Sequence, residues 1–393
     1  MSQQLINLSP DLHRLFEDGY EISIEHGHLI VRHIPYVTSR REIALGTLVS
    51  TLAMSGDRTN PPDTHVMMFG GEFPCDSNGA ALEKIRHSST RQIIGGDLIV
   101  DHSFSSKPLA GYKDYYEKVV TYASLLSNHA AVIDATVTAR TKRVVEAADE
   151  SSFVYIDNAS GRAGISAASQ KLRQASVAIV GLGGTGSYVL DQLAKTPIEA
   201  IHIYDGDIFQ QHNAFRAPGA ASIAELRSRP LKVDYLAAIY GNMHKGIVKH
   251  PCYIDAGNVD ELASYSMAFL CVDANEDKPV IIDLLEKANV PFIDVGIGLE
   301  LVDGKLVGSV RTTTSTPAMR HHIKARSRIP LHHIDGNDLY ARNIQVADLN
   351  ALNACLAVIR WKKLCGYYAD AEQEHFSLFT IDSNHLLNED FAA

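Results

Sequence analysis

The sequence has few cysteines, and no two of them are close enough in the sequence to form a metal-binding or redox pair. There are five, at positions 75, 252, 271, 355 and 365, with no CxxC motif among them. Paired cysteines staple secreted domains or hold structural zinc, so we expect neither a disulfide framework nor a zinc site. This cysteine usage fits a reducing, cytoplasmic environment best.

Long apolar runs and a surplus of basic residues are also missing. No stretch of 18 apolar residues occurs, and residues 1–20 lack the apolar segment of a secretory leader. We therefore expect neither a membrane span nor secretion. The formal net charge is −10. This argues against a nucleic-acid partner, because a phosphate backbone is bound by dense Lys and Arg surfaces.

What the sequence does contain is an ordinary globular composition over a length that favours two domains. A chain of 393 residues with 46% hydrophobic and 21% charged residues is expected to fold throughout. Residues 140–165 are mostly small or charged, which suggests a boundary. We expect an N-terminal domain at 1–145, a second domain at 160–370 and a C-terminal tail at 371–393.

The first domain is predicted to be α+β. Residues 20–35 alternate as strand material, and Pro35 is expected to close the run. Residues 112–126 place Tyr115 and Val119 on one face at helical spacing, which predicts a helix that packs on the core.

Strands alternate with helices through the second domain. Strands are predicted at 176–180, 200–204, 267–272, 291–295 and 305–312. Helices are predicted at 187–195, 231–243 and 279–288. This alternation predicts a Rossmann-like α/β fold, a mainly parallel sheet with helices on both faces.

Two histidine pairs, His321-His322 and His332-His333, raise the question of a metal site. Adjacent residues point to different faces, and no Cys or carboxylate spacing joins the pairs. Solvated histidines are therefore the preferred interpretation.

A glycine-rich turn follows the first strand of the second domain and opens a helix, which is the context that a nucleotide-binding turn requires. The turn, GLGGTG, contains Gly181, Gly183, Gly184 and Gly186. Asp205 ends the next strand, where an acidic side chain can bind ribose hydroxyls. These features fit NAD as well as ATP, and a turn that serves only tight packing is the plainer alternative.

Polar and charged residues beyond this turn separate the two nucleotides. They are Asp207, Asn213, Arg216, Lys232 and Asp273. A hydride-transfer site has no need of them. Attack by a carboxylate on the α-phosphate of ATP needs cations that offset the growing charge, and a carboxylate that holds Mg²⁺. The set predicts ATP- and Mg²⁺-dependent adenylation of a carboxyl group, with Arg216, Lys232 and Asp273 in catalytic roles.

At these residues the chain resembles the ThiF/MoeB/HesA superfamily, which includes the adenylation domains of ubiquitin-activating enzymes. The resemblance covers roughly residues 160–370, and it implies that residues 343–363 form the long helix that closes the family's fold. It implies that the glycine turn and the neighbouring Asp207 belong to the ATP site, and that Asp205 holds the ribose. It also implies that Asp273 holds Mg²⁺. The phosphates would be held by Asn213, Arg216 and Lys232.

The same resemblance implies a homodimer in which Arg162, ahead of the first strand, reaches a nucleotide in the partner subunit. The chain departs from the family in two ways, because it lacks the zinc-binding CxxC pairs and has no cysteine between positions 272 and 354. Many members carry a nucleophilic cysteine in that region. Cys75 remains as a candidate thioester residue in a loop that could be exposed, with a structural role as the preferred alternative.

Residues 1–140, with PCD at 74–76, FSSKP at 104–108 and DYYEK at 114–118, resemble an N-terminal domain found fused to bacterial ThiF-type domains. This implies a ubiquitin-like protein as substrate, a conjugating enzyme as possible partner, and antiviral defence as a possible setting. Substrate or partner recognition is the expected role of this domain. A sulfur-carrier protein, a peptide substrate and a nucleotide-binding scaffold without catalysis remain as alternatives.

Overall fold

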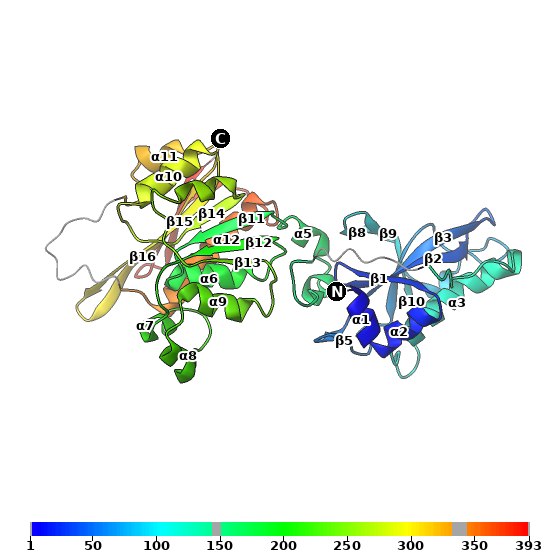
Figure 1. The fold of residues 1–393 in the computed structure, drawn as a ribbon. Helices are drawn as coiled ribbons and strands as arrows, with labels where there is room; N and C mark the ends of the chain where they lie inside the picture. The colour runs from blue at the N-terminus through cyan, green and yellow to red at the C-terminus, as the bar shows by residue number, and fades with distance from the viewer. Residues whose placement is uncertain (1, 144–150, 332–343, 392–393) are drawn as a thin grey trace. The chain divides into compact units, whose positions relative to one another are not determined.

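The computed structural model describes residues 2–143, 151–331 and 344–391 (Figure 1). Within these ranges, none of the helices combines the length and the apolar character that a bilayer span needs. His332 and His333, and the start of the helix predicted at 343–363, lie outside the described residues.

The chain divides into two compact units, which we describe one at a time. The N-terminal unit comprises Met1–Ser151 and Tyr155–Gln170. The C-terminal unit comprises Ser152–Val154 and Lys171–Ala393. The segment that the sequence marks as a boundary therefore contributes short pieces to both units.

A six-stranded antiparallel sheet forms the centre of the N-terminal unit, as expected for an α+β domain. In sheet order its strands are β1 (Glu21–Glu25), β2 (His28–Val37), β3 (Ile43–Thr51), β6 (Val66–Gly70), β10 (His102–Ser105) and β7 (Arg86–Ser88). Two small hairpins lie outside it, β4–β5 (Met54–Ser55 and Arg58–Thr59) and β8–β9 (Gln92–Gly95 and Leu98–Val100).

Helices cover one face of this sheet and the β8–β9 hairpin covers the other. The helices are α1 (Ser2–Leu8), α2 (Pro10–Glu17) and α3 (Tyr115–Ile133). Tyr115 and Val119 of α3 pack with Leu29 in the main core cluster, which confirms the predicted core helix. Ile30 points to the opposite face and packs with Ile94.

The strand expected at 20–35 is instead two strands joined by a turn at Gly27, whose φ is +74°. Pro35 does not close the run, because it pairs with Leu45 inside β2. The ladder is irregular just before it, between Val31 and Ile34. A bulge of this kind lets a strand accommodate a proline, which has no N–H to donate.

The C-terminal unit contains an eight-stranded sheet, and its Rossmann-like architecture confirms the predicted fold class. The parallel strands, in sheet order, are β13 (Ile247–His250), β12 (Ala200–Tyr204), β11 (Ser176–Val180), β14 (Met267–Leu270) and β15 (Phe292–Val302). Three antiparallel strands continue it, β16 (Lys305–Ser315), β17 (Glu374–Thr380) and β18 (His385–Phe391). Residues 371–393, expected as a tail, thus supply two strands to the same sheet.

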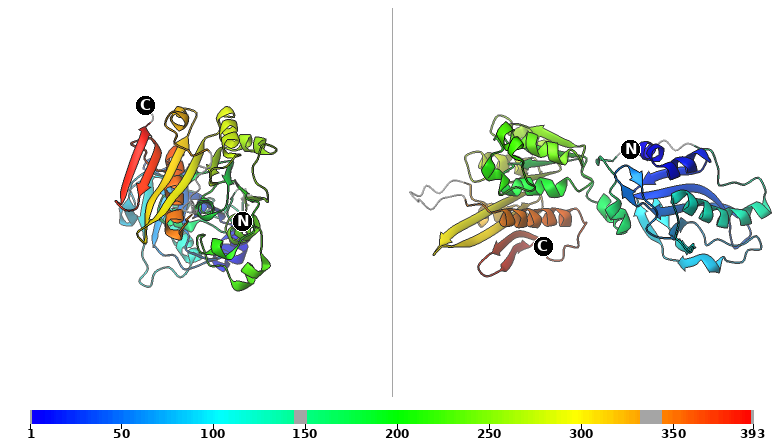
Figure 2. Two further views of the ribbon diagram at one scale, coloured as in Figure 1. Left: turned by 90° about the vertical axis from the view of Figure 1, so that its left-hand side faces the viewer. Right: turned by 90° about the horizontal axis from the view of Figure 1, so that it is seen from below.

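Helices lie on both faces of this sheet. One face carries α6 (Gly184–Leu193), α9 (Lys232–Tyr240) and α12 (Ala347–Leu364), whose apolar residues share one core cluster. The other carries α10 (Lys278–Lys287), α11 (His321–Ala325) and the 3₁₀ helix η2 (Val259–Ser264), in a second cluster. The long helix α12 packs against α6, β15 and β16, as Figure 2 shows. Short helices α7 (Gln211–Ala214) and α8 (Ile223–Ser228) precede α9.

Solvated histidines are not what the structure shows at His322. Its side chain is buried in the C-terminal unit, beside His375. Burial lowers the pKa of His322 to about 4. A neutral histidine explains how an imidazole is accommodated in the core, because a charged one would be strongly disfavoured there.

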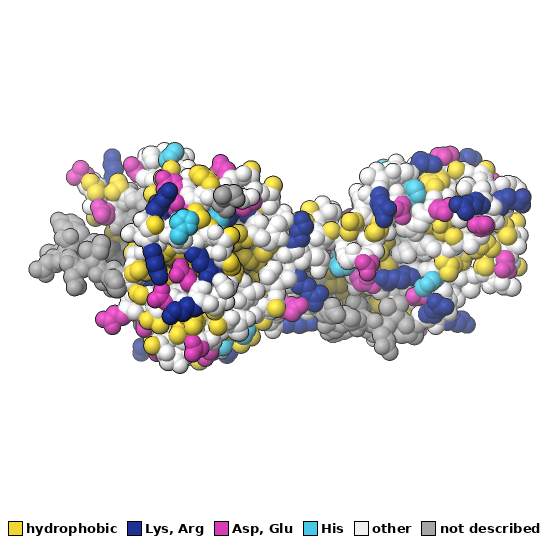
Figure 3. All heavy atoms as spheres, turned by 90° about the horizontal axis from the view of Figure 1, so that it is seen from above, with side chains coloured by type: hydrophobic (Ala, Val, Ile, Leu, Met, Phe, Trp, Pro, Cys, Tyr) yellow, Lys and Arg dark blue, Asp and Glu magenta, His cyan; other side chains and the backbone are white. Residues whose placement is uncertain are grey.

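The surface carries both signs of charge. Figure 3 shows acidic and basic side chains interspersed on the face in view of each unit. On that face no single-sign area dominates, so it does not offer the dense basic surface that a phosphate backbone needs.

Candidate functional site

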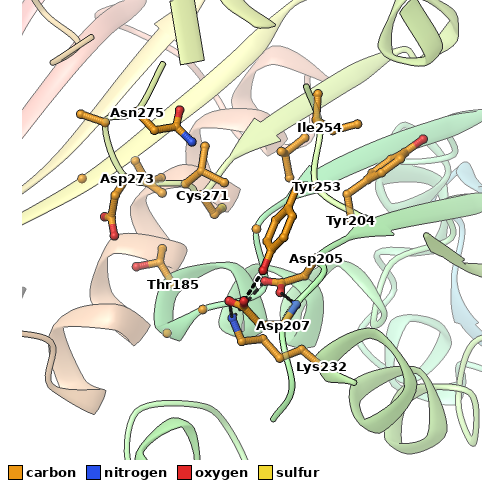
Figure 4. Close-up of a pocket in the computed structure, with 18 of the residues that line it drawn as sticks. Thr185, Tyr204, Asp205, Asp207, Lys232, Tyr253, Ile254, Cys271, Asp273 and Asn275 are labelled. Carbon is orange, nitrogen blue, oxygen red and sulfur yellow. Dashed lines mark hydrogen bonds and ion pairs between the residues drawn. The ribbon is translucent and has the colours of Figure 1, made fainter. Parts of the chain in front are cut away.

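A cavity of about 350 Å³ opens at the carboxyl ends of β11, β12 and β14 (Figure 4). Ligands of open α/β sheets bind at this edge, where the connections leave the strands. Most of the candidate residues singled out in the second domain line it. They are Gly181, Gly183, Gly184, Asp205, Asp207, Arg216, Lys232 and Asp273.

The glycine turn at this edge depends on close backbone contacts. Gly181 has φ +90°, and a Cβ there would lie 2.7 Å from the carbonyl oxygen of Cys271. A Cβ on Gly186 would lie 2.0 Å from the carbonyl oxygen of Gly181. Gly183 has no atom within 4 Å of its Cβ position. Gly181 and Gly186 therefore allow the turn to close, and α6 can begin directly at the cavity with its free N–H groups.

Asp205 holds the turn and the following loop together. Its Oδ2 accepts a hydrogen bond from the Leu182 amide at 2.7 Å, and its Oδ1 accepts one from the Asp207 amide at 2.8 Å. The side chain is buried. A carboxylate has about four acceptor positions, so Asp205 retains capacity for a ribose hydroxyl.

Lys232 is the first residue of α9 and pairs with two carboxylates. Its Nζ lies 2.7 Å from Oδ2 of Asp207 and 3.2 Å from Oδ2 of Asp205. The hydroxyl of Tyr253 donates to the other oxygen of Asp207, and Figure 4 shows these contacts. Since an ammonium has three donors, Lys232 has one left for a phosphate oxygen.

These hydrogen bonds shift the pKa values of the two acidic groups. Burial opposes ionisation of Asp207, but the hydrogen bonds from Lys232 and Tyr253 outweigh it and lower the Asp207 pKa. The bond to Asp207 raises the pKa of Tyr253 to about 12. Asp207 is therefore anionic and Tyr253 neutral at physiological pH.

The segment around α7 brings one of its two predicted residues to the cavity. Arg216 lines it, and the Arg216 Nε is buried without a hydrogen-bond partner among the described residues. Asn213 does not line it, because its Oδ1 accepts a hydrogen bond from the Gln210 amide at 2.8 Å and caps α7. Arg216 can therefore contact a phosphate, whereas Asn213 shapes the helix that precedes it.

Asp273 lies in the loop between β14 and α10, and Figure 4 shows it beside Thr185, away from Lys232. No group of three or more His, Cys, Asp or Glu suited to a metal occurs within the described residues. Mg²⁺ is usually bound by one or two carboxylates together with substrate phosphates. Asp273 fits that mode of binding, since it adds one carboxylate to a cavity already suited to phosphates.

Two predicted residues belong to the N-terminal unit and do not line the cavity. Arg162 ends the short helix α4 (Asn158–Arg162), and its Nε lies 3.1 Å from Oδ2 of Asp63. Only 3% of the surface of Cys75 is accessible, which fits the structural role preferred for it rather than that of an exposed thioester residue. Cys75 bridges Val37 and Ala81 between extended segments, and burial raises the pKa of its thiol.

Sequence reasoning missed Tyr253, Asn275 and Gln345, which also line the cavity. Tyr253 follows β13, a four-residue strand that the sequence did not predict. Its ring packs over Gly206, where a Cβ would lie 2.8 Å from the ring. The neighbouring Gly206 is therefore the sequence feature that permits this placement.

Two family models match the chain. Residues 10–158 match a domain of unknown function, DUF6791, and residues 159–317 match the ThiF family. Ubiquitin-like modifier-activating enzyme 5 of Culex quinquefasciatus is 23% identical over 156 residues, 37% of this chain and 39% of that protein. The chain thus spans about two fifths of this curated relative.

Solved structures with partial similarity to this chain include those of PaaA and of E. coli MccB. The crystal structure of selenomethionine PaaA has 18% identity and a TM-score of 0.44. The match covers 57% of this chain and 75% of the PaaA chain. The E. coli MccB structure with ATP has 17% identity and a TM-score of 0.44. The match covers 61% of this chain and 73% of the MccB chain.

Proposed function

From the ThiF family domain that residues 159–317 form, we propose that this protein adenylates a carboxyl group with ATP and Mg²⁺. The substrate we propose is the C-terminal carboxylate of a ubiquitin-like protein, in keeping with the activating enzyme that the domain resembles. One observation carries the proposal. Arg216 and Lys232, from the connection between β12 and β13, and Asp273, from the loop after β14, line the same cavity as the glycine turn.

The cavity suits a nucleoside triphosphate. The N–H groups at the start of α6 favour a phosphate by about 1 kcal/mol, through the helix dipole and unpaired donors. Asp205 would receive the ribose, and Arg216 and Lys232 would contact phosphate oxygens. Asp273 would hold Mg²⁺, which supplies Lewis-acid charge stabilisation when bound.

In the reaction we propose, an oxygen of the substrate carboxylate attacks the α-phosphorus. The bond from the α-phosphorus to the bridging oxygen breaks, and pyrophosphate leaves with the electron pair. The products are an acyl adenylate and pyrophosphate. Arg216 and Lys232 offset the negative charge that grows on the phosphoryl oxygens and on the leaving group.

We further propose that the product passes to a thiol of a second protein, such as a conjugating enzyme. The burial of Cys75 supports this, since an inaccessible thiol with a raised pKa is a poor nucleophile. A homodimer, in which Arg162 serves the partner's nucleotide, is part of the same proposal. So is a place in a bacterial ubiquitin-like conjugation pathway.

ATP–pyrophosphate exchange tests the proposed chemistry. Asp273→Ala should lower the exchange rate on the order of 10²-fold or more, because a metal ligand is worth several kcal/mol in the transition state. The matched control is Asp234→Ala, an exposed residue of α9 that pairs with Lys249 outside the cavity. Wild-type exchange in a folded Asp273→Ala variant would contradict the assignment.

The substrate is tested separately by intact mass. The protein is incubated with ATP, Mg²⁺ and, in turn, a ubiquitin-like protein, a sulfur-carrier protein and a short peptide, each with a free C-terminus. A mass increase of one adenylate on the ubiquitin-like protein alone supports the substrate we propose. Adenylation of the sulfur carrier or peptide alone would keep the chemistry and overturn the substrate.

A further inference from the structure

A buried charged cluster lies behind the loop that carries Asp273. Lys278 begins α10, Asp294 lies on β15 and Arg311 lies on β16. Lys278 Nζ is 2.6 Å from Oδ2 of Asp294, and an Arg311 guanidinium nitrogen is 2.6 Å from Oδ1. Lys278 and Asp294 are almost completely buried, with 2% and 0% of their surface exposed. None of the three lines the cavity.

Lys278 also ties down the loop between β14 and α10. Its Nζ donates to the carbonyl oxygen of Val272 at 3.0 Å, directly before Asp273. Its backbone N–H donates to Oδ1 of Asn275 at 2.9 Å. One residue therefore holds the loop on both sides of Asp273. Arg311, by contrast, donates to Asp294 and to Thr313, both on strands of the sheet.

The charge of Lys278 is costly where it lies. Removing an ammonium from water costs several kcal/mol, and a buried ion pair often contributes no more stability than apolar residues of the same size. The bond to the Val272 carbonyl is something that an apolar side chain could not supply. A role in fixing the loop therefore explains the buried charge of Lys278 better than a contribution to the stability of the fold does.

We propose that Lys278, held in place by Asp294, is a positioning residue that fixes the 272–277 loop so that Asp273 can accept a divalent cation together with the triphosphate. This inference rests on the proposed function. It assigns Lys278 no contact with the nucleotide. Residues that orient a metal ligand typically change metal affinity about 10- to 100-fold when replaced.

Two matched substitutions separate this role from general stability. Lys278→Met and Arg311→Met each leave Asp294 with one cation, but only the first removes the bond to Val272. ATP binding is measured by calorimetry without divalent cation and then across a series of Mg²⁺ concentrations. Circular dichroism and thermal unfolding confirm that each variant is folded.

In Lys278→Met we expect affinity for metal-free ATP within about twofold of wild type, because the glycine turn and Lys232 are untouched. Mg²⁺ is expected to raise the affinity for ATP. The Mg²⁺ concentration at which half of this gain is reached should be about tenfold higher, or more, than in the wild type. Arg311→Met should keep the wild-type Mg²⁺ dependence. Lys278→Gln keeps a hydrogen-bond donor near the Val272 carbonyl without the charge. It should recover most of the wild-type Mg²⁺ dependence.

Equal Mg²⁺ dependence in Lys278→Met and Arg311→Met overturns the inference. If Lys278→Met does not fold, Asp294→Asn takes its place, since it weakens the hold on Lys278. The same rise in required Mg²⁺ is then expected, and a value equal to that of Arg311→Met overturns the inference. Wild-type protein that binds no ATP refutes the proposed function as well. If ATP binding by the wild type depends on Mg²⁺ and all variants show the same Mg²⁺ dependence, this inference alone is refuted.

Discussion

The carboxylate of Asp207 shows how single residues prepare the cavity. It accepts hydrogen bonds from Lys232 and Tyr253, which come from a helix start and from a loop after β13. Lys232 donates to Asp205 as well, so the two carboxylates together occupy two of its three donors. Arg216 keeps a buried Nε without a partner among the described residues, so this donor is available for an oxyanion.

A prediction at this scale concerns Cys75. Cys75→Ser should leave ATP–pyrophosphate exchange within about twofold of wild type, because the side chain is buried outside the cavity and its thiol pKa is raised. The check is exchange kinetics with a thiol-sensitive gel of the substrate complex. A covalent complex that reductant releases, and that is missing only in this variant, would show that Cys75 is the acceptor after all.

At the scale of elements, the strand–turn–helix unit β11–α6 is set by backbone proximity. Gly186, the third residue of α6, lies against the carbonyl of Gly181, and Gly184 lies against the side chain of Asn350 on α12. Thr185 donates to Oδ1 of Asn350 at 2.8 Å. The long helix therefore supports the glycine turn from behind, which couples the two elements.

Replacement of two glycines tests this arrangement. Gly186→Ala should lower the free energy of unfolding by about 1–3 kcal/mol and weaken ATP binding, since its Cβ would overlap the Gly181 carbonyl. Gly183→Ala is the matched control for stability, because open space surrounds its Cβ position, and it should lower the free energy of unfolding by less than about 1 kcal/mol as an N-cap change. Urea unfolding compares the two variants, and ATP titration is read for Gly186→Ala alone, because Gly183 lines the cavity. Equal losses of unfolding free energy in the two variants would contradict the contact argument.

At the scale of the whole molecule, each unit buries histidine in neutral form. His28 lies in the N-terminal unit, and His244 and His322 lie in the C-terminal unit. Burial lowers the pKa of all three below the ordinary value of 6.5. The unfolded chain therefore binds more protons than the folded one just below that pH.

The resulting prediction is a loss of stability on acidification. The buried neutral histidines contribute to the free energy of unfolding. This contribution should be fully present above pH 6.5 and should fall as the pH drops toward about 4, the pKa of His322 in the folded protein. Urea midpoints between pH 7.5 and 4.5 measure it. In His322→Phe the decline should be shallower, because this position no longer takes up a proton on unfolding. An unchanged slope would mean that His322 is not kept neutral in the fold.

The sequence by itself determined the features that depend on local pattern. The alternation of strands and helices gave the α/β class, and the apolar stripe with Tyr115 gave a core helix. The glycine turn and Asp205 marked the cavity, because a turn needs particular residue types at adjacent positions whatever the rest of the chain does.

Contacts between distant segments decided the rest, and these leave little local trace. Only the tertiary structure placed Tyr253 at the cavity, turned Asn213 to cap its own helix and buried Cys75. It also joined residues beyond 371 to the main sheet, and set Lys278 against Asp294 under the Asp273 loop. The physical reason is common to all of them. Burial and pairing depend on which segments meet in space, and a residue's neighbours in the sequence do not specify that.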